Sequence, residues 1–339
     1  MEILIFDPVF DQSIAIAKYL KKYGNCTVVG CMRQYPTGKL WRLNNYKYFD
    51  KIIVHDINKE LLDQFPVAIP TNAVATSEFF ELVETYKIGD VNFNRKNLEV
   101  SDKIFMLDLC GKLNIPIPTT YLPDDKIKNF PVFYKSRHES SNLKKLRGLA
   151  QKQSDLDNLP HKEIIIQEYI ETPETFGVGF IADNGKITAY AMHKELLSYP
   201  KRGGSGVLLE RINDERLLNY TLSLVKTLEY NGWGLAEFKY SPERNDFVFM
   251  EINAKFWASF EFTLLCNPLF GKYLLGLDYP NVSVKYMTFT HRLLVTNIFR
   301  IIKHLPQIVV SYKTKSGNWR KVILEILNHW AGKLIEVKN

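Results

Sequence analysis

The chain has 339 residues, of which 46% are hydrophobic and 24% charged, and 44 basic against 37 acidic residues give a net charge of +7. This composition is typical of a globular protein and excludes a largely disordered chain. The length exceeds one typical domain, and no run of about 18 uncharged apolar residues predicts a membrane span. The first residues read as a core strand and not as a secretory leader, so we expect a cytoplasmic protein.

Composition also limits the partners. The four cysteines have neither metal-binding spacing nor a secreted disulfide pattern. Basic residues are interspersed with acidic ones, and no zinc-finger spacing, aromatic RNA-binding motif or basic arm is present, so we expect no nucleic-acid partner. Binding an anionic small molecule requires far fewer positive groups than binding a nucleic acid, so this net charge is compatible with a small anionic ligand.

Residues 1–98 alternate between strand and helix patterns. An apolar strand over Glu2–Phe6 precedes a helix over Ser13–Lys22 and a strand over Cys26–Cys31, with further strands at 51–54 and 67–70. Alternation of this kind predicts a parallel sheet covered by helices. The first turn, DPVFDQS, lacks the glycines that a dinucleotide phosphate requires, so we exclude that site.

The middle of the chain predicts a helix and then antiparallel strands. Residues 101–114 form an amphipathic pattern capped by Ser101, and the prolines at 116 and 118 make the next segment extended. A strand over Pro131–Lys135 leads into a polar loop at 136–145, and a second strand covers 163–170. Asn184-Gly185 predicts a hairpin turn between strands at 176–183 and 187–193, followed by a helix over 214–228.

The segment 232–259 carries the strongest chemical signal. Two alternating strands flank the turn sequence SPERND, and with the hairpin centred near Arg244, Glu237 lies directly opposite Glu251. Two carboxylates about 5 Å apart repel each other in a plain sheet. A divalent cation would turn that repulsion into ligation, and Asn253 on the face of Glu251 adds a neutral oxygen. The alternative is a solvated face on which Lys239 and Lys255 neutralise the acids.

Several motifs together resemble the ATP-grasp superfamily, in its carboxylate–amine ligase and carbamoyl-phosphate-synthase-like branch. Asp102-Lys103 with Gly111 and residues 115–119 is similar to the family's "DK…G-I-P-x-P-x-T" segment. Residues 131–135 (PVFYK) resemble its "P-V-V-x-K" strand, and residues 167–170 (QEYI) resemble its hinge. Residues 250–257 (MEINAKFW) are similar to "M-E-I-N-P-R-F-W".

The resemblance implies both cofactors, ATP and Mg²⁺, and the roles of named residues. Nucleotide binding is assigned to Lys103, Lys135, Gln167, Glu168, Tyr169, Ile170 and Glu174, with Lys135 on the phosphates and Glu174 on the ribose. The magnesium ligands are Glu237, Glu251 and Asn253. On the substrate side, a Gly-rich, cationic segment over 193–206 and the motif lysine make Lys194, Arg202 and Lys255 the catalytic candidates.

Three positions depart from the family pattern. The expected phosphate-covering loop has no glycine before Gly148, Lys255 replaces an arginine, and Ala258 replaces a glycine. The implied reaction joins a carboxylate, activated as an acyl phosphate, to an amine-type nucleophile, by analogy in surface-glycan, peptide or secondary-metabolite biosynthesis. The alternatives are an ATP-grasp kinase acting on a hydroxyl and a nucleotide-binding protein that has lost catalysis.

The expected fold class is α/β plus α+β. A parallel-sheet pre-ATP-grasp domain spans 1–98, and an ATP-grasp domain spans 99–285, with a smaller subdomain and hinge at 99–172 and a larger one at 173–285. A helical tail follows at 286–339. The tail is basic and amphipathic, and we favour its packing against the protein's own core over contact with a membrane surface. The oligomeric state is not predicted.

Overall fold

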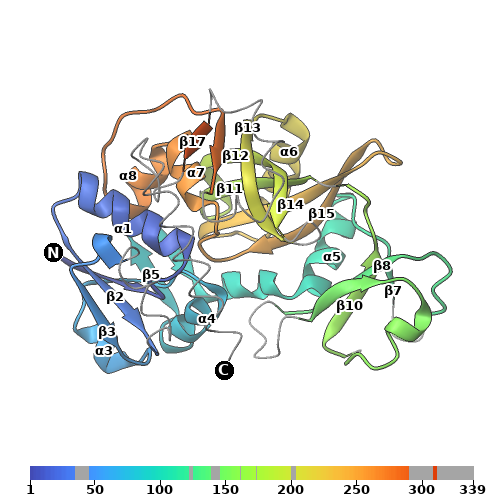
Figure 1. The fold of residues 1–339 in the computed structure, drawn as a ribbon, viewed down its shortest axis with the longest axis horizontal. Helices are drawn as coiled ribbons and strands as arrows, with labels where there is room; N and C mark the ends of the chain where they lie inside the picture. Colours follow the sequence, from blue (N-terminus) through green and yellow to red (C-terminus); the bar gives the residue numbers. More distant parts are fainter. Residues whose placement is uncertain are drawn as a thin grey trace, which may run out of the picture.

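The structure is a computed structural model that describes residues 1–34, 46–121, 125–138, 146–160, 162–172, 174–199, 204–289 and 308–310. Arg202, most of the expected phosphate-covering loop and most of the expected helical tail lie outside these residues. Four sheets and their helices make up the described part (Figure 1).

The N-terminal unit is the predicted parallel sheet. Its strands lie in the order β3-β2-β1-β4 and all neighbours run parallel. The predicted helix and strands are confirmed to within a few residues, and Gly24 is the C-cap of the first helix. The elements are β1 (Glu2–Phe6), α1 (Asp11–Tyr23), β2 (Thr27–Met32), η1 (Tyr46–Tyr48), β3 (Lys51–Val54), α3 (Lys59–Asp63), β4 (Val67–Ile69) and α4 (Ala73–Leu82).

A short hairpin and two helical segments lead out of this unit. The hairpin, β5 (Thr85–Ile88) with β6 (Val91–Asn94), was not predicted. The 3₁₀ segment η2 (Arg95–Ser101) then precedes α5 (Lys103–Lys112). The predicted Ser101 cap is wrong: Ser101 ends η2, and the Asp102 carboxylate instead accepts the Ile104 N–H at 2.9 Å.

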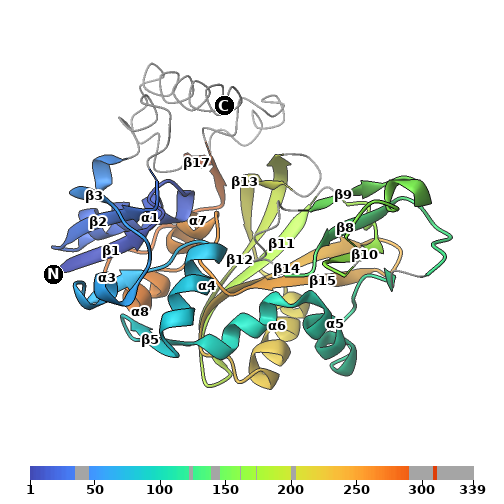
Figure 2. The same cartoon turned by 90° about the horizontal axis from the view of Figure 1, so that it is seen from below.

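A small antiparallel sheet in the order β7-β10-β8-β9 forms a separate lobe (Figure 2). Its strands are β7 (Thr120–Tyr121), β8 (Val132–Ser136), β9 (Arg147–Ala150) and β10 (Ile164–Glu168), with the turn η3 (Gln153–Asp155). Val132, Ile164 and Ile166 belong to a core of the lobe's own. Because strand side chains alternate, Lys135 on β8 points to the opposite face.

The large sheet has the order β15-β14-β11-β12-β13-β16-β17. Asn184 and Gly185 both have positive φ and form the predicted turn between β11 and β12. Within the Gly-rich, cationic segment over 193–206, residues 193–199 continue the predicted strand as part of β12, which pairs with β13 from Ser205 onward. The strands are β11 (Thr175–Asp183), β12 (Lys186–Tyr199), β13 (Ser205–Ile212), β14 (Gly232–Ser241), β15 (Asp246–Asn253), β16 (Tyr286–Thr288) and β17 (Ile308–Val310).

Helices α6 (Glu215–Thr227), α7 (Phe260–Cys266) and α8 (Leu269–Leu275) accompany this sheet. Asp214 caps α6. Residues 286–288 and 308–310, within the expected helical tail, instead form strands β16 and β17. β16 pairs with β13 and extends the large sheet, and β17 pairs in parallel with β16. One continuous apolar core joins the large sheet to the N-terminal unit. No helix among the described residues has both the length and the apolar character needed to cross a bilayer.

Candidate active site

The two acids of the β14–β15 hairpin stand where the sequence predicted them. Glu237 pairs directly with Glu251, and Leu235 pairs with Asn253, so the register is confirmed. The register shifts by one residue immediately after the acidic pair, since Phe238 faces Phe249 and Met250 has no partner of its own. Directly opposed strand residues have Cβ atoms about 5 Å apart, so the two carboxylates share one patch of the sheet.

Two lysines from outside the hairpin neutralise Glu251. Lys103 Nζ lies 3.6 Å and Lys135 Nζ 3.5 Å from Glu251 Oε2. Lys135 also donates to the Met250 carbonyl at 3.1 Å. Burial raises the pKa of Glu251, but the charges of Lys135, Lys103 and Lys255 outweigh it and hold that pKa at about 2. Burial also lowers the pKa of Lys135, and Glu251 partly offsets this. The carboxylate therefore stays ionised at neutral pH.

An ion pair positions these lysines. Arg137, just beyond β8, binds both carboxylate oxygens of Asp102, with Nε donating at 2.9 Å. The Lys103 N–H in turn donates to the Arg137 carbonyl at 3.2 Å. Asp102 is the cap of α5, so the start of that helix is fastened to the end of β8. As a result, the lysines at 103 and 135 reach the same acid.

Lys255 and Asn253 contact each other at the end of β15. The Lys255 ammonium donates to Asn253 Oδ1 at 2.6 Å. The strand ends at Asn253, so Lys255 lies in the segment that follows it. The alternative of a hairpin face neutralised by its own lysines describes Glu251 only in part. Lys255 contributes to the low pKa of this acid, but Lys103 on α5 and Lys135 on β8 lie within ion-pair distance of it. Lys239 instead donates to the Thr172 carbonyl at 3.1 Å.

The predicted hinge residues lie where β10 meets the large sheet. The Glu168 N–H donates to the Thr119 carbonyl at 2.8 Å, and its carboxylate accepts the Thr119 N–H at 2.9 Å. The same carboxylate pairs with Arg244 at the turn of the β14–β15 hairpin. Gln167 and Ile170 are buried, and Tyr169 is partly buried. The hinge is thus tied to the hairpin that carries the acids.

Lys194 lies on the opposite side of the large sheet from the acidic pair. Lys194 faces Phe176 across β11, whereas Glu237 faces Gly177, so strand alternation puts Lys194 on the other side of the sheet. Lys194 Nζ lies 3.2 Å from the carboxylate of Glu174. The structure therefore brings Glu174 and Lys194 together, but it does not bring Lys194 to Glu251.

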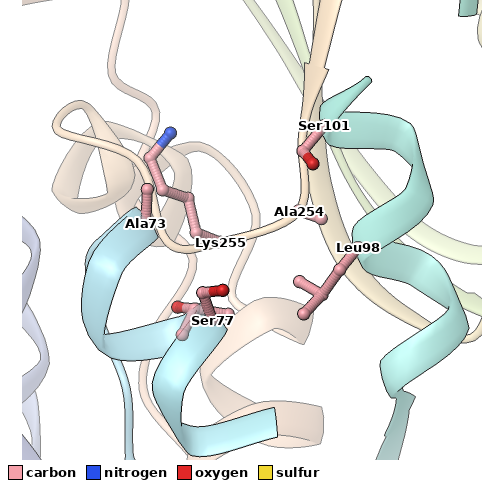
Figure 3. A pocket seen from close by; sticks show the side chains of 7 residues that line it. Ala73, Ser77, Leu98, Ser101, Ala254 and Lys255 are labelled. Atoms are coloured by element: carbon pink, nitrogen blue, oxygen red, sulfur yellow. The ribbon is translucent and has the colours of Figure 1, made fainter. Parts of the chain in front are cut away.

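A small pocket that the sequence did not predict lies beside Lys255 (Figure 3). Its volume is about 30 Å³, and the first turn of α4 supplies one of its walls. The hydroxyl of Thr76, a residue that is 1% exposed, has no hydrogen-bond partner among the described residues. Only the packing of α4 against the segment after β15 reveals this pocket. Its lining residues are Ala73, Thr76, Ser77, Leu98, Ser101, Ala254 and Lys255.

The oxygen atoms of Glu237, Glu251 and Asn253 suit a cation that also binds oxygen atoms of another ligand. No cluster of three or more histidine, cysteine or acidic side chains able to hold a metal occurs in the described part of the chain. Glu237, Glu251 and Asn253 provide two carboxylates and one amide oxygen. Mg²⁺ is commonly held by one or two carboxylates together with phosphate oxygens and water, so the set fits Mg²⁺ bound with a nucleotide.

Comparison with solved structures identifies the fold. No family profile and no curated protein matches the chain by sequence. The biotin carboxylase domain of Hydrogenobacter thermophilus 2-oxoglutarate carboxylase, solved with MgADP and bicarbonate, matches with a TM-score of 0.58 at 12% identity, over 84% of this chain and 73% of that one.

Two further enzymes match over similar lengths. They are N5-carboxyaminoimidazole ribonucleotide synthetase from Thermotoga maritima (TM-score 0.55, 16% identity, 83% of this chain and 77% of that one) and L-amino acid ligase from Bacillus licheniformis (TM-score 0.54, 10% identity, 78% and 69%). At these identities the likeness concerns the fold. The chain therefore shares the fold of these enzymes over most of its length.

Proposed function

We propose that the protein is an ATP- and Mg²⁺-dependent ligase that activates a carboxylate as an acyl phosphate and joins it to an amine-type nucleophile. The observation that carries this proposal is the convergence of Glu237 and Glu251 with Lys103 and Lys135. Oxygen ligands for a divalent cation and positive charges for phosphate oxygens thereby meet in one place. The ligases among the structural neighbours support this class of reaction.

In this proposal, Lys103 and Lys135 bind phosphate oxygens of ATP. Glu237, Glu251 and Asn253 would hold Mg²⁺, which neutralises the charge that develops on the phosphoryl group. A carboxylate oxygen of the substrate attacks the γ-phosphorus, and ADP leaves with the electrons of the broken P–O bond. The amine then attacks the acyl carbon, loses a proton and expels phosphate. The ion pairs around Glu251 hold the lysines ready for an incoming anion.

The pocket beside Lys255 is the place that we assign to the substrate carboxylate. Lys255 borders this pocket while its ammonium donates to Asn253 Oδ1, and Ser77, Ser101 and Thr76 carry hydroxyl groups among the lining residues. A buried hydroxyl without an acceptor is unfavourable, and a carboxylate oxygen would relieve this cost for Thr76. The volume of about 30 Å³ suits a head group and not a whole substrate.

ATP affinity and product analysis test the proposal. Calorimetry on the full chain should show ATP binding that strengthens when Mg²⁺ is added. A screen of carboxylate and amine pairs should release ADP only when both are present, and mass spectrometry should find the condensed product. If the carboxylate carries oxygen-18, one labelled oxygen should appear in the released phosphate. A phosphorylated hydroxyl product would instead indicate a kinase, and ATP binding without turnover on any pair would indicate a nucleotide-binding protein.

A further inference from the structure

The positive charge of the chain is concentrated at its C-terminal end. Residues 290–339 contain nine basic and two acidic residues, and the other 35 basic and 35 acidic residues lie in 1–289. The net charge of +7 therefore belongs entirely to the last 50 residues. Basic and acidic residues balance each other only in the part of the chain before them.

The same end of the chain carries an amphipathic pattern. Residues 311–339 lie outside the described part of the chain, and their sequence has apolar residues at helical spacing over 319–335. Two of these apolar residues are tryptophans, and three basic side chains belong to the same stretch. The apolar positions are Trp319, Val322, Ile323, Ile326, Leu327, Trp330 and Leu334, and the basic ones are Arg320, Lys321 and Lys333.

Strand β17 determines where this segment leaves the folded body. Val310, the last residue of β17, pairs with Thr288 on β16, which in turn pairs with Leu208 on β13. Among the described strands, β17 forms one edge of the large sheet, and β15 with Glu251 forms the opposite edge (Figure 2). Residues 311–339 therefore start at a fixed edge of the protein, five strands away from the hairpin that carries the acidic pair.

Charge and apolar pattern together distinguish the surfaces that such a segment can bind. Packing against the protein's own core, which the pattern alone favours, requires the apolar positions but no surplus of positive charge. Binding to a nucleic acid requires the charge but not a row of seven apolar residues. An anionic membrane surface uses both features. Apolar side chains and tryptophan enter the boundary between head groups and acyl chains, while basic side chains contact the anionic head groups.

We propose that residues 311–339 attach this protein to the surface of a membrane that contains anionic phospholipid. The segment lies on the bilayer with its apolar positions buried and does not cross it, because charged residues recur throughout 319–335. Because the attraction is electrostatic in part, salt weakens it. This inference does not depend on the proposed function, since the segment starts at the edge of the large sheet opposite to the acidic pair.

Co-sedimentation of the full chain with vesicles tests this proposal. Wild type should bind vesicles with about 30% phosphatidylserine at least about tenfold more tightly than vesicles of phosphatidylcholine alone, and less tightly at high salt. The variant Arg320→Gln/Lys321→Gln/Lys333→Gln should lose at least about tenfold of this affinity. The matched control removes three exposed charges from the folded body and should bind like wild type. It is Lys59→Gln/Lys96→Gln/Lys226→Gln.

Tryptophan fluorescence shows whether the segment itself enters the membrane. Trp233 and Trp257 are buried in the protein core. Anionic vesicles with brominated acyl chains should therefore quench wild type mainly through Trp319 and Trp330. In Trp319→Phe/Trp330→Phe most of this quenching should disappear while the melting temperature stays unchanged. Quenching equal to that of wild type in this variant would place another part of the chain at the membrane and overturn the inference.

Three other results would overturn the inference. One is that wild type binds neither kind of vesicle or binds both equally well. Another is wild-type affinity for anionic vesicles in the variant of Arg320, Lys321 and Lys333. The third is binding to a DNA oligonucleotide but not to vesicles, which would assign the segment to a nucleic acid. Thermal melting of each variant confirms that the proteins compared are folded.

Discussion

The ammonium group of Lys135 lies 3.5 Å from the carboxylate of Glu251 and joins the small lobe to the edge of the large sheet. The two residues are 116 positions apart in the chain and belong to different sheets. Lys135 additionally binds the Met250 carbonyl, so it contacts both a charge and a backbone group of β15. A cation held in this way links the small lobe to β15. The same contact makes Glu251 the residue whose replacement tests the site most directly.

Replacing Glu251 with Gln should reduce ADP formation by at least about 100-fold while the protein stays folded. The substitution removes a charged ligand from the proposed Mg²⁺ site and retains the shape of the side chain. ADP release at saturating Mg²⁺ measures the effect, and circular dichroism checks the fold. Glu243→Gln, at an exposed position in the same hairpin turn, is the matched control and should keep full activity. Wild-type turnover in Glu251→Gln would contradict the assigned metal site.

Replacing Thr76 with Val should raise the KM for the carboxylate substrate about tenfold without lowering the melting temperature. Valine has nearly the same shape, and the hydroxyl it removes has no partner among the described residues, so the folded state loses no internal bond. Steady-state kinetics and thermal melting measure the two effects. Thr85→Val, an exposed position on β5, should change neither. An unchanged KM would mean that the substrate does not reach the pocket beside Lys255.

His193 should make the stability of the protein depend on acidic pH. Burial lowers the pKa of its imidazole from 6.5 to about 4. The unfolded chain therefore binds a proton in the pH range where the folded protein does not, and stability decreases as the pH falls from 6.5 toward 4. The upper limit of this loss is about 3 kcal/mol. Denaturant unfolding at several pH values should show a shallower pH dependence in His193→Gln than in wild type. His55→Gln, at an exposed position, should keep the wild-type slope.

The buried ion pair between Lys18 on α1 and Glu261 on α7 should stabilise the junction of the N-terminal unit with the large sheet. Glu261→Met leaves a buried ammonium without this acid and should cost about 3–5 kcal/mol of unfolding free energy. The double variant Lys18→Met/Glu261→Met should recover most of that loss. Glu84→Gln breaks the exposed pair with Arg95 and should cost less than about 1 kcal/mol. Equal losses in the single and double variants would show that the pair itself is not the cause.

Two glycine substitutions should have opposite effects. A Cβ at Gly179 would lie 2.6 Å from Cζ2 of Trp257, which is packed against Phe260. Gly179→Ala should therefore destabilise the protein by about 1–3 kcal/mol.

A Cβ at Gly111, inside α5, meets nothing within 4 Å. Gly111→Ala should stabilise by about 0.5–1 kcal/mol, because alanine loses less backbone entropy in a helix. The melting temperature, compared with that of wild type, should fall in Gly179→Ala and rise in Gly111→Ala.

Local patterns predicted the parts of the fold that short-range geometry controls. Strand alternation and the turn at SPERND placed Glu237 opposite Glu251, and Asn184-Gly185 marked its hairpin correctly. The β5–β6 hairpin was missed although Gly89, with positive φ, sits at its turn, so the signal was present. The strands within the expected tail were missed for a different reason. They form because the edge of the large sheet offers them a partner, which no local pattern reveals.

By itself, the sequence determined the register of the acidic hairpin and the order of the motifs that resemble a known fold, because each motif depends on residues close together in the chain. Only the tertiary structure decided which cations meet Glu251, where Lys194 points, and that Thr76 and Gln167 keep unpaired polar atoms. These features depend on burial and on contacts between different strands and helices, up to the 116 positions that separate Lys135 from Glu251. Both are set by packing of the whole chain, whereas periodicity and turn chemistry act only within a few residues.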